Sequence, residues 1–210
     1  MQKTARSSRP MLRDGDIRRI LEEHLVDQHR CMGDTTILHE MKVYRPTARV
    51  DLAVVNGELC AFEIKSDVDS LCRLSHQIDA YSAVFDRVSL VTTSKHLKSG
   101  RQKVPAWWGI SVSDGVTVSV RRTPKKNPNR SHESLLYSLS RGELLAILAA
   151  NGASRGLSAR NTSTLVSAIM SRLGSTDIDV SCRQVLKRRR GGHIPSSSSP
   201  SETADNCSAE

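Results

Sequence analysis

Hydrophobic and polar residues alternate most regularly along two neighbouring segments of the chain, residues 48–55 and 59–65. Apolar side chains recur there at every second position, which is typical of strands that bury one face. Asn56-Gly57 lies between the two segments, and this dipeptide strongly favours a β-hairpin. The pattern therefore predicts two antiparallel strands joined by a short turn.

The same alternation predicts which side chains share a face of this hairpin. If the apolar residues at even positions face the core, Asp51 and Glu63 share the opposite face, with Lys65 one pleat further along. A strict two-residue turn would pair Asp51 with Phe62 and would separate the two acids. The pattern therefore predicts a three-residue loop or a bulge, with Gly57 in the left-handed conformation.

Helical and strand patterns on both sides place the hairpin in an α/β domain. Helical spacing of apolar residues is seen at 16–29, at 71–85 after a capping Ser70, and at 140–152 and 163–173. Further strands are expected at 36–43, 87–92, 108–112 and 116–120. Ser140 and Glu143 have the spacing of a capping box, which favours a helix start at that point.

The patterns divide the chain into five parts. These are a flexible basic N-terminus (1–13), an α/β domain (14–122), a basic linker (123–132), a helix–extended–helix element (133–175), and a basic, then Ser/Pro-rich disordered tail (176–210).

Composition narrows the class of protein. Aromatic residues make up only 3% of the 210 residues, so the core must be mainly aliphatic. The chain has no apolar run long enough to cross a bilayer, which argues against a membrane partner, and its N-terminus lacks the apolar segment of a secretory signal. Five cysteines without CxxC spacing argue against a zinc site or a disulfide framework and fit a reducing cytoplasm.

The net charge of +9 favours a polyanionic partner such as nucleic acid. The alternative is a charge that serves solubility and is concentrated in the terminal segments.

Charge also affects the hairpin, because facing carboxylates at Asp51 and Glu63 would repel each other. A divalent cation would relieve that repulsion. The alternative is an ion-paired cluster in which Lys65 offsets the acids and stabilises the sheet.

These residues resemble the motif of the PD-(D/E)XK nuclease superfamily, the restriction-endonuclease-like fold. Asp51 lies on one strand and Glu63-Ile64-Lys65 on the next, and the helix that follows carries Gln77 and Tyr81 with the Q-x-x-x-Y spacing of RecB-like branches. Residues 16–120 are similar to a bacterial and phage-borne branch that reads R-V-D and then E-I-K-S-D. Val50 stands where the superfamily name has proline, a position that takes no part in the chemistry.

The resemblance implies a metal-dependent nuclease. Asp51 and Glu63 would bind Mg²⁺ or Mn²⁺ with the Ile64 carbonyl, and one metal-bound water could act as the nucleophile. Lys65 would orient that water or stabilise charge on the phosphate. Gln77 and Tyr81 would position the backbone or Lys65; for Tyr81 core packing is the alternative, and for Gln77 a solvated helix position. Several branches of the superfamily have a further acidic metal ligand upstream, and Glu40 stands at that place in this sequence.

The C-terminal element resembles the SAP-like helix–extended–helix module, which binds DNA; the alternative is a helical hairpin that packs on the core. DNA is the expected partner, with RNA as the alternative, and relatives that cut as dimers make a homodimer an option. The competing function is a catalytically silent nucleic-acid-binding module, or a partner-dependent subunit of a defence or mobile-element system. The residues expected to contact nucleic acid are Arg49, Arg121, Arg122, Lys125, Lys126, Arg155 and Arg160.

Overall fold

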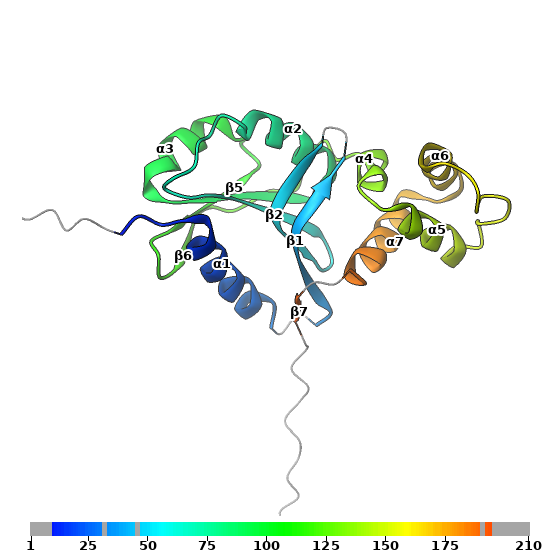
Figure 1. Ribbon diagram of the computed structural model, residues 1–210, viewed down its shortest axis with the longest axis horizontal. Coiled ribbons are helices and arrows are strands. Elements are labelled where there is room, and N and C mark those ends of the chain that lie inside the picture. The colour runs from blue at the N-terminus through cyan, green and yellow to red at the C-terminus, as the bar shows by residue number, and fades with distance from the viewer. Residues whose placement is uncertain (1–9, 31–32, 45–46, 190–191, 195–210) are drawn as a thin grey trace, which may run out of the picture.

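A mixed β-sheet forms the centre of the molecule, and helices cover both of its faces (Figure 1). The structure is a computed structural model, and it describes residues 10–30, 33–44, 47–189 and 192–194. The expected basic segment before residue 10 and the Ser/Pro-rich segment after residue 194 lie outside the described residues. The α/β class predicted from the sequence is confirmed.

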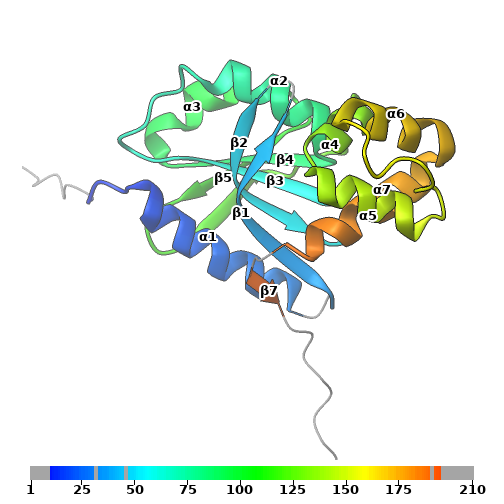
Figure 2. The ribbon, with the colours of Figure 1, turned by 45° about the vertical axis from the view of Figure 1, so that its right-hand side comes forward.

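The elements follow in the order α1(Asp14–His29), β1(Thr35–Val43), β2(Ala48–Val55), β3(Leu59–Lys65), α2(Leu74–Val84), β4(Arg87–Thr92), α3(Ser94–Lys103), β5(Gly109–Ser113), β6(Val118–Arg122), α4(His132–Tyr137), α5(Arg141–Ala150), α6(Thr162–Arg172), α7(Ser175–Lys187) and β7(Gly192–Ile194). The sheet has the strand order β6-β5-β4-β3-β2-β1-β7. β3, β4 and β5 are parallel, and the other neighbouring strands are antiparallel. The crossover helices α2 and α3 lie on one face, and α1 lies on the other (Figure 2).

The hairpin register agrees with the sequence prediction. Val55 pairs with Leu59, so the loop has three residues, and the ladder continues to the pair Leu52 and Phe62. Odd positions therefore pair with odd positions, and even with even. The prediction of a three-residue loop is confirmed, and it brings the Asp51 end of β2 beside the Glu63 end of β3.

The predicted left-handed conformation of Gly57 is wrong. Its φ angle is not in the positive range, although four other glycines among the described residues have positive φ angles. The loop is closed instead by the side chain of Asn56, whose Oδ1 accepts the Gly57 N–H at 2.7 Å, and by the Asn56 N–H, which donates to the Glu58 carbonyl at 3.1 Å. This local turn removes the need for a left-handed residue.

Both faces of the hairpin are buried, in two separate hydrophobic clusters. Leu52, Val54 and Ile64 pack with α1, and Ala53 packs with α2 and the C-terminal helices. Val50 was predicted to share the face of Leu52, but it joins the cluster of Ala53. The alternation is therefore interrupted at Asp51, the residue between Val50 and Leu52.

A matching irregularity lies on the neighbouring strand. Leu52 and Val50 pair with His39 and Met41, so the interrupted position of β2 stands opposite Glu40. Glu40 has a φ angle of 52°, and no other non-glycine residue that the structure describes has a positive φ angle. A backbone strained in this way is uncommon outside turns and functional sites.

Helix α2 begins later than predicted, at Leu74 rather than near residue 71. Its N-cap residue is Arg73, and the Oγ of Ser70 accepts the Cys72 N–H at 3.2 Å in the preceding turn instead of capping the helix. The capping box of Ser140 and Glu143 is confirmed at the start of α5. Strands β5 and β6 lie one to two residues further along the chain than expected.

The prediction of a disordered segment from residue 176 is wrong for its first part, because α7 occupies Ser175–Lys187. Ile178, Cys182 and Leu186 repeat at helical spacing and are buried. They belong to the same hydrophobic cluster as α2 and the sheet. The predicted flexible N-terminus also ends earlier, since Leu12 is buried and its N–H donates to Asp67 Oδ2 at 2.8 Å.

The basic linker is held firmly against the sheet domain. The Asn127 side-chain amide donates to the carbonyls of Ser82 and Phe85 at 2.7 and 2.8 Å. Further along, the Arg130 guanidinium forms ion pairs with Asp86, between α2 and β4, and with Asp179 on α7. Arg130 thus links the sheet domain to the C-terminal helix α7 through ion pairs.

Among the residues the structure describes, no helix has both the length and the apolar character needed to cross a membrane.

Removing the Arg130 side chain should strongly destabilise the fold. The side chains of Arg130 and Asp86 are only 10% and 8% exposed, so Arg130→Ala would leave a buried carboxylate without its cation. We expect a loss of about 3–5 kcal/mol in the free energy of unfolding, measured by urea denaturation. The control Arg19→Ala removes an exposed pair with Glu23 and should cost under about 1 kcal/mol. Equal losses in the two variants would contradict a stabilising role for the buried network.

Candidate functional site

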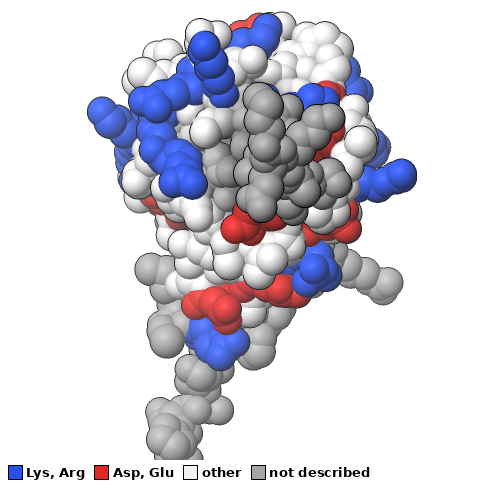
Figure 3. All heavy atoms as spheres, turned by 90° about the vertical axis from the view of Figure 1, so that its left-hand side faces the viewer, with Lys and Arg blue, Asp and Glu red and all other residues white. Residues whose placement is uncertain are grey.

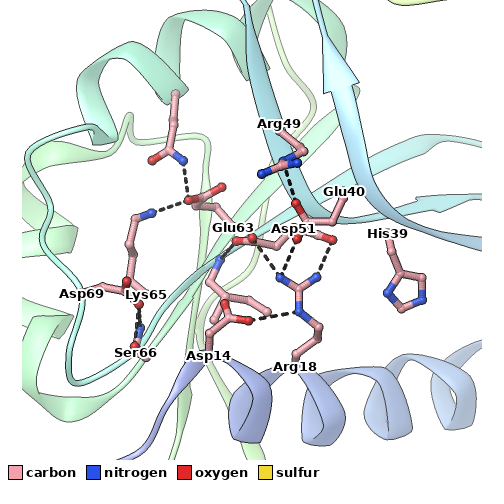
Figure 4. A network of polar contacts seen from close by, with 12 residues as sticks. Asp14, Arg18, His39, Glu40, Arg49, Asp51, Glu63, Lys65, Ser66 and Asp69 are labelled. Atoms are coloured by element: carbon pink, nitrogen blue, oxygen red, sulfur yellow. Dashed lines mark hydrogen bonds and ion pairs between the residues drawn. The ribbon is translucent and has the colours of Figure 1, made fainter.

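A cavity of about 610 Å³ opens where β2 and β3 separate, between α1 and α2. Figure 4 shows its acidic and basic side chains converging from the two strands, from α1 and from the loop after β3. The predicted site residues Asp51, Glu63, Ile64, Lys65 and Gln77 all line it, together with Glu40 and Arg49. The structure therefore brings together, in one place, the residues of the predicted catalytic motif.

Asp51 lies between the separating strands. The β2–β3 ladder ends at Leu52 and Phe62, and beyond that pair the Asp51 Oδ2 accepts the Ile64 N–H at 2.7 Å. A carboxylate thus takes the place of a strand carbonyl. This hydrogen bond fixes one oxygen of Asp51 beside the start of Glu63-Ile64-Lys65.

Glu63 is the most buried carboxylate of the cavity, with 1% of its surface exposed. Its Oε1 accepts hydrogen bonds from Lys65 Nζ and from Gln77 Nε2, the latter at 2.6 Å. Its Oε2 accepts one from the Tyr81 hydroxyl at 2.7 Å. Three donors therefore hold both oxygens of a carboxylate that would be very costly to bury alone.

Tyr81 both packs in the core and positions a site residue, the two roles predicted as alternatives from the sequence. The side chain is fully buried and its ring stacks on Trp108, with ring centroids 6.1 Å apart. Its hydroxyl lies 2.7 Å from both the Glu63 Oε2 and the Arg49 carbonyl, although it has only one proton to donate. Burial, and then the charge of Glu63, raise the pKa of the Tyr81 hydroxyl far above its ordinary value. Tyr81 therefore remains a neutral donor.

Gln77 is directed into the site rather than into solvent. Its amide nitrogen donates to Glu63, while its Oε1 is buried and has no hydrogen-bond partner. An unpaired buried acceptor costs free energy. This oxygen could accept a hydrogen bond from a water or from a hydrated ion beside Glu63.

Arg18 on α1 is the site residue that the sequence analysis missed. Its guanidinium donates to the Asp51 Oδ1 at 3.1 Å, to the Asp51 carbonyl at 2.9 Å and to Glu40 Oε1 at 2.9 Å, and its Nε donates to Asp14 at 3.1 Å. One guanidinium thus contacts three carboxylates (Figure 4). Nothing in the local sequence marks Arg18, because the contact arises from the packing of α1 under the sheet.

Burial and the neighbouring Glu63 raise the pKa of the Asp51 carboxyl from 3.8 to about 7. The Ile64 N–H and the Arg18 charge act in the opposite direction but do not cancel this effect. Asp51 is thus poised to exchange a proton, or a cation, near neutral pH.

Glu40 lies in the cavity, as expected from several branches of the resembled superfamily. Its carboxylate forms ion pairs with Arg18 at 2.9 Å and with Arg49 at 2.7 Å. Within the described ranges, no three His, Cys, Asp or Glu side chains are grouped so as to hold a metal ion. Asp51 and Glu63, with the Ile64 carbonyl, supply oxygen ligands of the type that magnesium accepts while keeping several waters. The residues therefore fit an ion held by two carboxylates.

The other basic residues predicted to contact nucleic acid lie away from the cavity. Arg121, Lys125 and Lys126 are exposed on β6 and the linker, and Arg155 and Arg160 are exposed between α5 and α6. Arg122 is partly buried, and its guanidinium donates to the carbonyls of Trp108 and Pro105 at 2.6 and 2.9 Å. These residues remain predicted contacts.

A basic surface that was not predicted lies on α3. The helix carries Lys95, Lys98, Arg101 and Lys103 and no acidic residue. Burial, and then the charge of Arg101, lower the pKa of Arg122, so these two cations lie close together. Figure 3 looks onto the end of the molecule where α3 lies and shows lysine and arginine side chains gathered on one part of it.

The pKa of Asp51 predicts how stability depends on pH. Between pH 3.8 and about 7 only the folded state holds this proton, so stability should fall as the pH rises through that window. Asp51→Asn should remove about 1–4 kcal/mol of that fall, measured by urea denaturation at pH 4 to 8 without metal. The control Asp27→Asn changes an exposed acid on α1. A wild-type pH profile for Asp51→Asn would contradict the raised pKa.

Comparisons with known proteins place this chain in a family. A relative, protein cII of Enterobacteria phage P4, is 36% identical over 111 residues, which are 53% of this chain and 42% of that protein. The aligned region thus spans less than half of the relative. A solved structure, the SPO1766 protein of unknown function from Silicibacter pomeroyi, is 19% identical with a TM-score of 0.39, and the match covers 55% of this chain and 74% of that one. Residues 9–193 match the family described as bacteriophage P4 protein cII, and the chain therefore belongs to that family.

Proposed function

We propose that this protein is a metal-dependent nuclease that hydrolyses phosphodiester bonds in DNA on a restriction-endonuclease-like fold. The observation that carries the proposal is the convergence of Asp51, Glu63 and Lys65 on one cavity, with Gln77 and Tyr81 holding Glu63. Separate elements supply these groups, and their order in the chain matches the D…E-x-K and Q-x-x-x-Y motifs.

In this proposal Asp51, Glu63 and the Ile64 carbonyl hold Mg²⁺ or Mn²⁺. When bound, such an ion polarises the phosphate and lowers the pKa of a bound water. Lys65, buried and paired with Glu63, stabilises negative charge on the phosphate or orients the water. Gln77 and Tyr81 keep both Glu63 oxygens in a fixed orientation, which reduces the reorganisation needed during reaction.

One observation favours the competing function, a nucleic-acid-binding module without turnover. Arg18 contacts Asp51 and Lys65 contacts Glu63, so cations of the protein already compensate both carboxylates. The two carboxylates therefore do not need a metal ion to balance their charge. An enzyme would cleave DNA when a divalent ion is added, and a silent module would not.

The proposal is tested by incubating plasmid and single-stranded DNA with Mg²⁺, Mn²⁺ or EDTA. We expect metal-dependent cleavage by the wild-type chain and a loss of about 10²- to 10³-fold in Lys65→Ala, because one stabilising charge is removed. The control Lys187→Ala removes a partly buried lysine outside the cavity that pairs with the exposed Asp34. It should cleave at the wild-type rate.

Two outcomes would decide against this mechanism. Cleavage that persists in EDTA, or that is as fast in Lys65→Ala as in the wild type, would show that another group performs the chemistry. DNA binding without cleavage under every metal would favour the silent module.

DNA binding should depend steeply on salt if the basic surface of α3 contacts phosphates. Each phosphate contact contributes about 0.9 to the slope of log K against log salt concentration for duplex DNA. The double variant Lys98→Ala/Arg101→Ala should therefore lower that slope by about 2 units in fluorescence-anisotropy titrations. The double variant Arg19→Ala/Arg30→Ala, on the acid-paired surface of α1, serves as the control. An unchanged slope in the α3 variant would remove α3 from the interface.

A further inference from the structure

The carboxylate cavity continues into two further cavities along the molecule. A second cavity, of about 540 Å³, shares Glu40 and Thr47 with the first and runs between β1 and α4. A third, of about 510 Å³, shares Tyr44 and Tyr137 with the second and reaches Asn161 at the start of α6. We call the second and third cavities together the β1–α6 groove. It connects the candidate site to the C-terminal helices.

Two tyrosines line this groove at its midpoint. All seven aromatic residues of the chain lie in its described part, and Tyr44 is the most exposed of them, at 47%. Tyr137 is half-buried beside it, with ring centroids 6.3 Å apart and planes inclined at 45°. A partly exposed aromatic pair is notable in a chain that buries Trp108, Tyr81 and Phe85 completely.

The charges along the groove suit a polyanion. Its two acids are already compensated: Glu40 pairs with Arg18 and Arg49, and Glu143 pairs with Arg189 at 2.6 Å. Lys42 lines the groove and is exposed. The far end lies at the N-terminus of α6, where backbone N–H groups favour negative charge.

We propose that the β1–α6 groove binds a single-stranded segment of nucleic acid that continues from the carboxylate cavity, with its bases stacked on Tyr44 and Tyr137. Each cavity has the volume of a site for a drug-sized ligand, which suits one or two nucleotides. Aromatic side chains next to cationic groups are the usual platform for single strands. The proposal rests on the proposed function, because the strand is the one presented to Asp51 and Glu63.

A purely structural role for the tyrosine pair makes a different prediction. The Tyr44 N–H donates to Ser138 Oγ at 3.3 Å, so the ends of β1 and α4 are already joined here by a hydrogen bond that does not involve the Tyr44 ring. If the rings serve only to pack β1 against α4, replacing Tyr44 should change stability and leave the binding of bases untouched.

The test measures binding of the full chain in EDTA, by fluorescence anisotropy, to a 12-nucleotide oligo(dT) and to an abasic strand of the same length. Tyr44→Leu should weaken binding of oligo(dT) about 5- to 100-fold, the range for loss of one stacked base, and leave the abasic strand unchanged. Tyr44→Phe keeps the ring and should bind oligo(dT) like the wild type. Oligo(rU) in a parallel titration distinguishes an RNA strand from a DNA strand.

Wild-type affinity of Tyr44→Leu for oligo(dT), or an equal loss for the abasic strand, would overturn the proposal. Urea denaturation of each variant shows whether a loss of binding reflects unfolding, and Tyr137→Phe and Tyr137→Leu repeat the comparison on the second ring. Plasmid cleavage in Mg²⁺ is scored separately. Absent cleavage with Tyr44-dependent oligo(dT) binding would reject the nuclease and keep the groove, and the reverse result would reject the groove alone.

Discussion

The arrangement of the site depends on one hydrogen bond, from the Ile64 N–H to the Asp51 carboxylate. Regular pairing of β2 and β3 stops at Leu52 and Phe62, and a side chain completes the next rung. Because the strands separate there, side chains from both faces of the sheet reach a common space. Arg18 enters it from α1, and Gln77 enters it from α2. A fully paired hairpin would keep these two side chains on opposite sides of the sheet.

The cavity is stable because its charges are matched closely. Glu63 is almost fully buried, yet it receives three donors, and Asp51 shares Arg18 with Glu40. Removing a single partner would leave a buried charge uncompensated. The balance also means that an incoming cation must compete with groups of the protein. The affinity for an ion therefore depends on the free energy needed to break the contacts of Arg18 with Asp51 and of Lys65 with Glu63.

The three-residue loop of the hairpin and its odd-with-odd pairing could be predicted from the sequence, because side-chain alternation is a local property. The interruption at Asp51, which puts Val50 on the other face from Leu52, could not be read from that alternation. The contribution of Arg18 could not, since it depends on how α1 packs under the sheet. Gly57 was assigned a left-handed conformation because that is its usual role in Asn-Gly turns, but the Asn56 side chain closes the loop instead. Helix α7 has apolar residues at helical spacing, at Ile178, Cys182 and Leu186. The helix was missed because the basic and Ser/Pro-rich residues that follow it led to a prediction of disorder for the whole segment.

The shared hydrophobic cluster has a consequence for how the molecule opens. Helices α4 to α7 and the α2 face of the sheet bury their side chains in one continuous core, and Asn127 and Arg130 fasten the connecting segment to it. A protease that reached this segment would need the core to open first. Cooperativity of this kind ties the C-terminal helices to the cavity, so neither part can loosen without exposing apolar surface of the other.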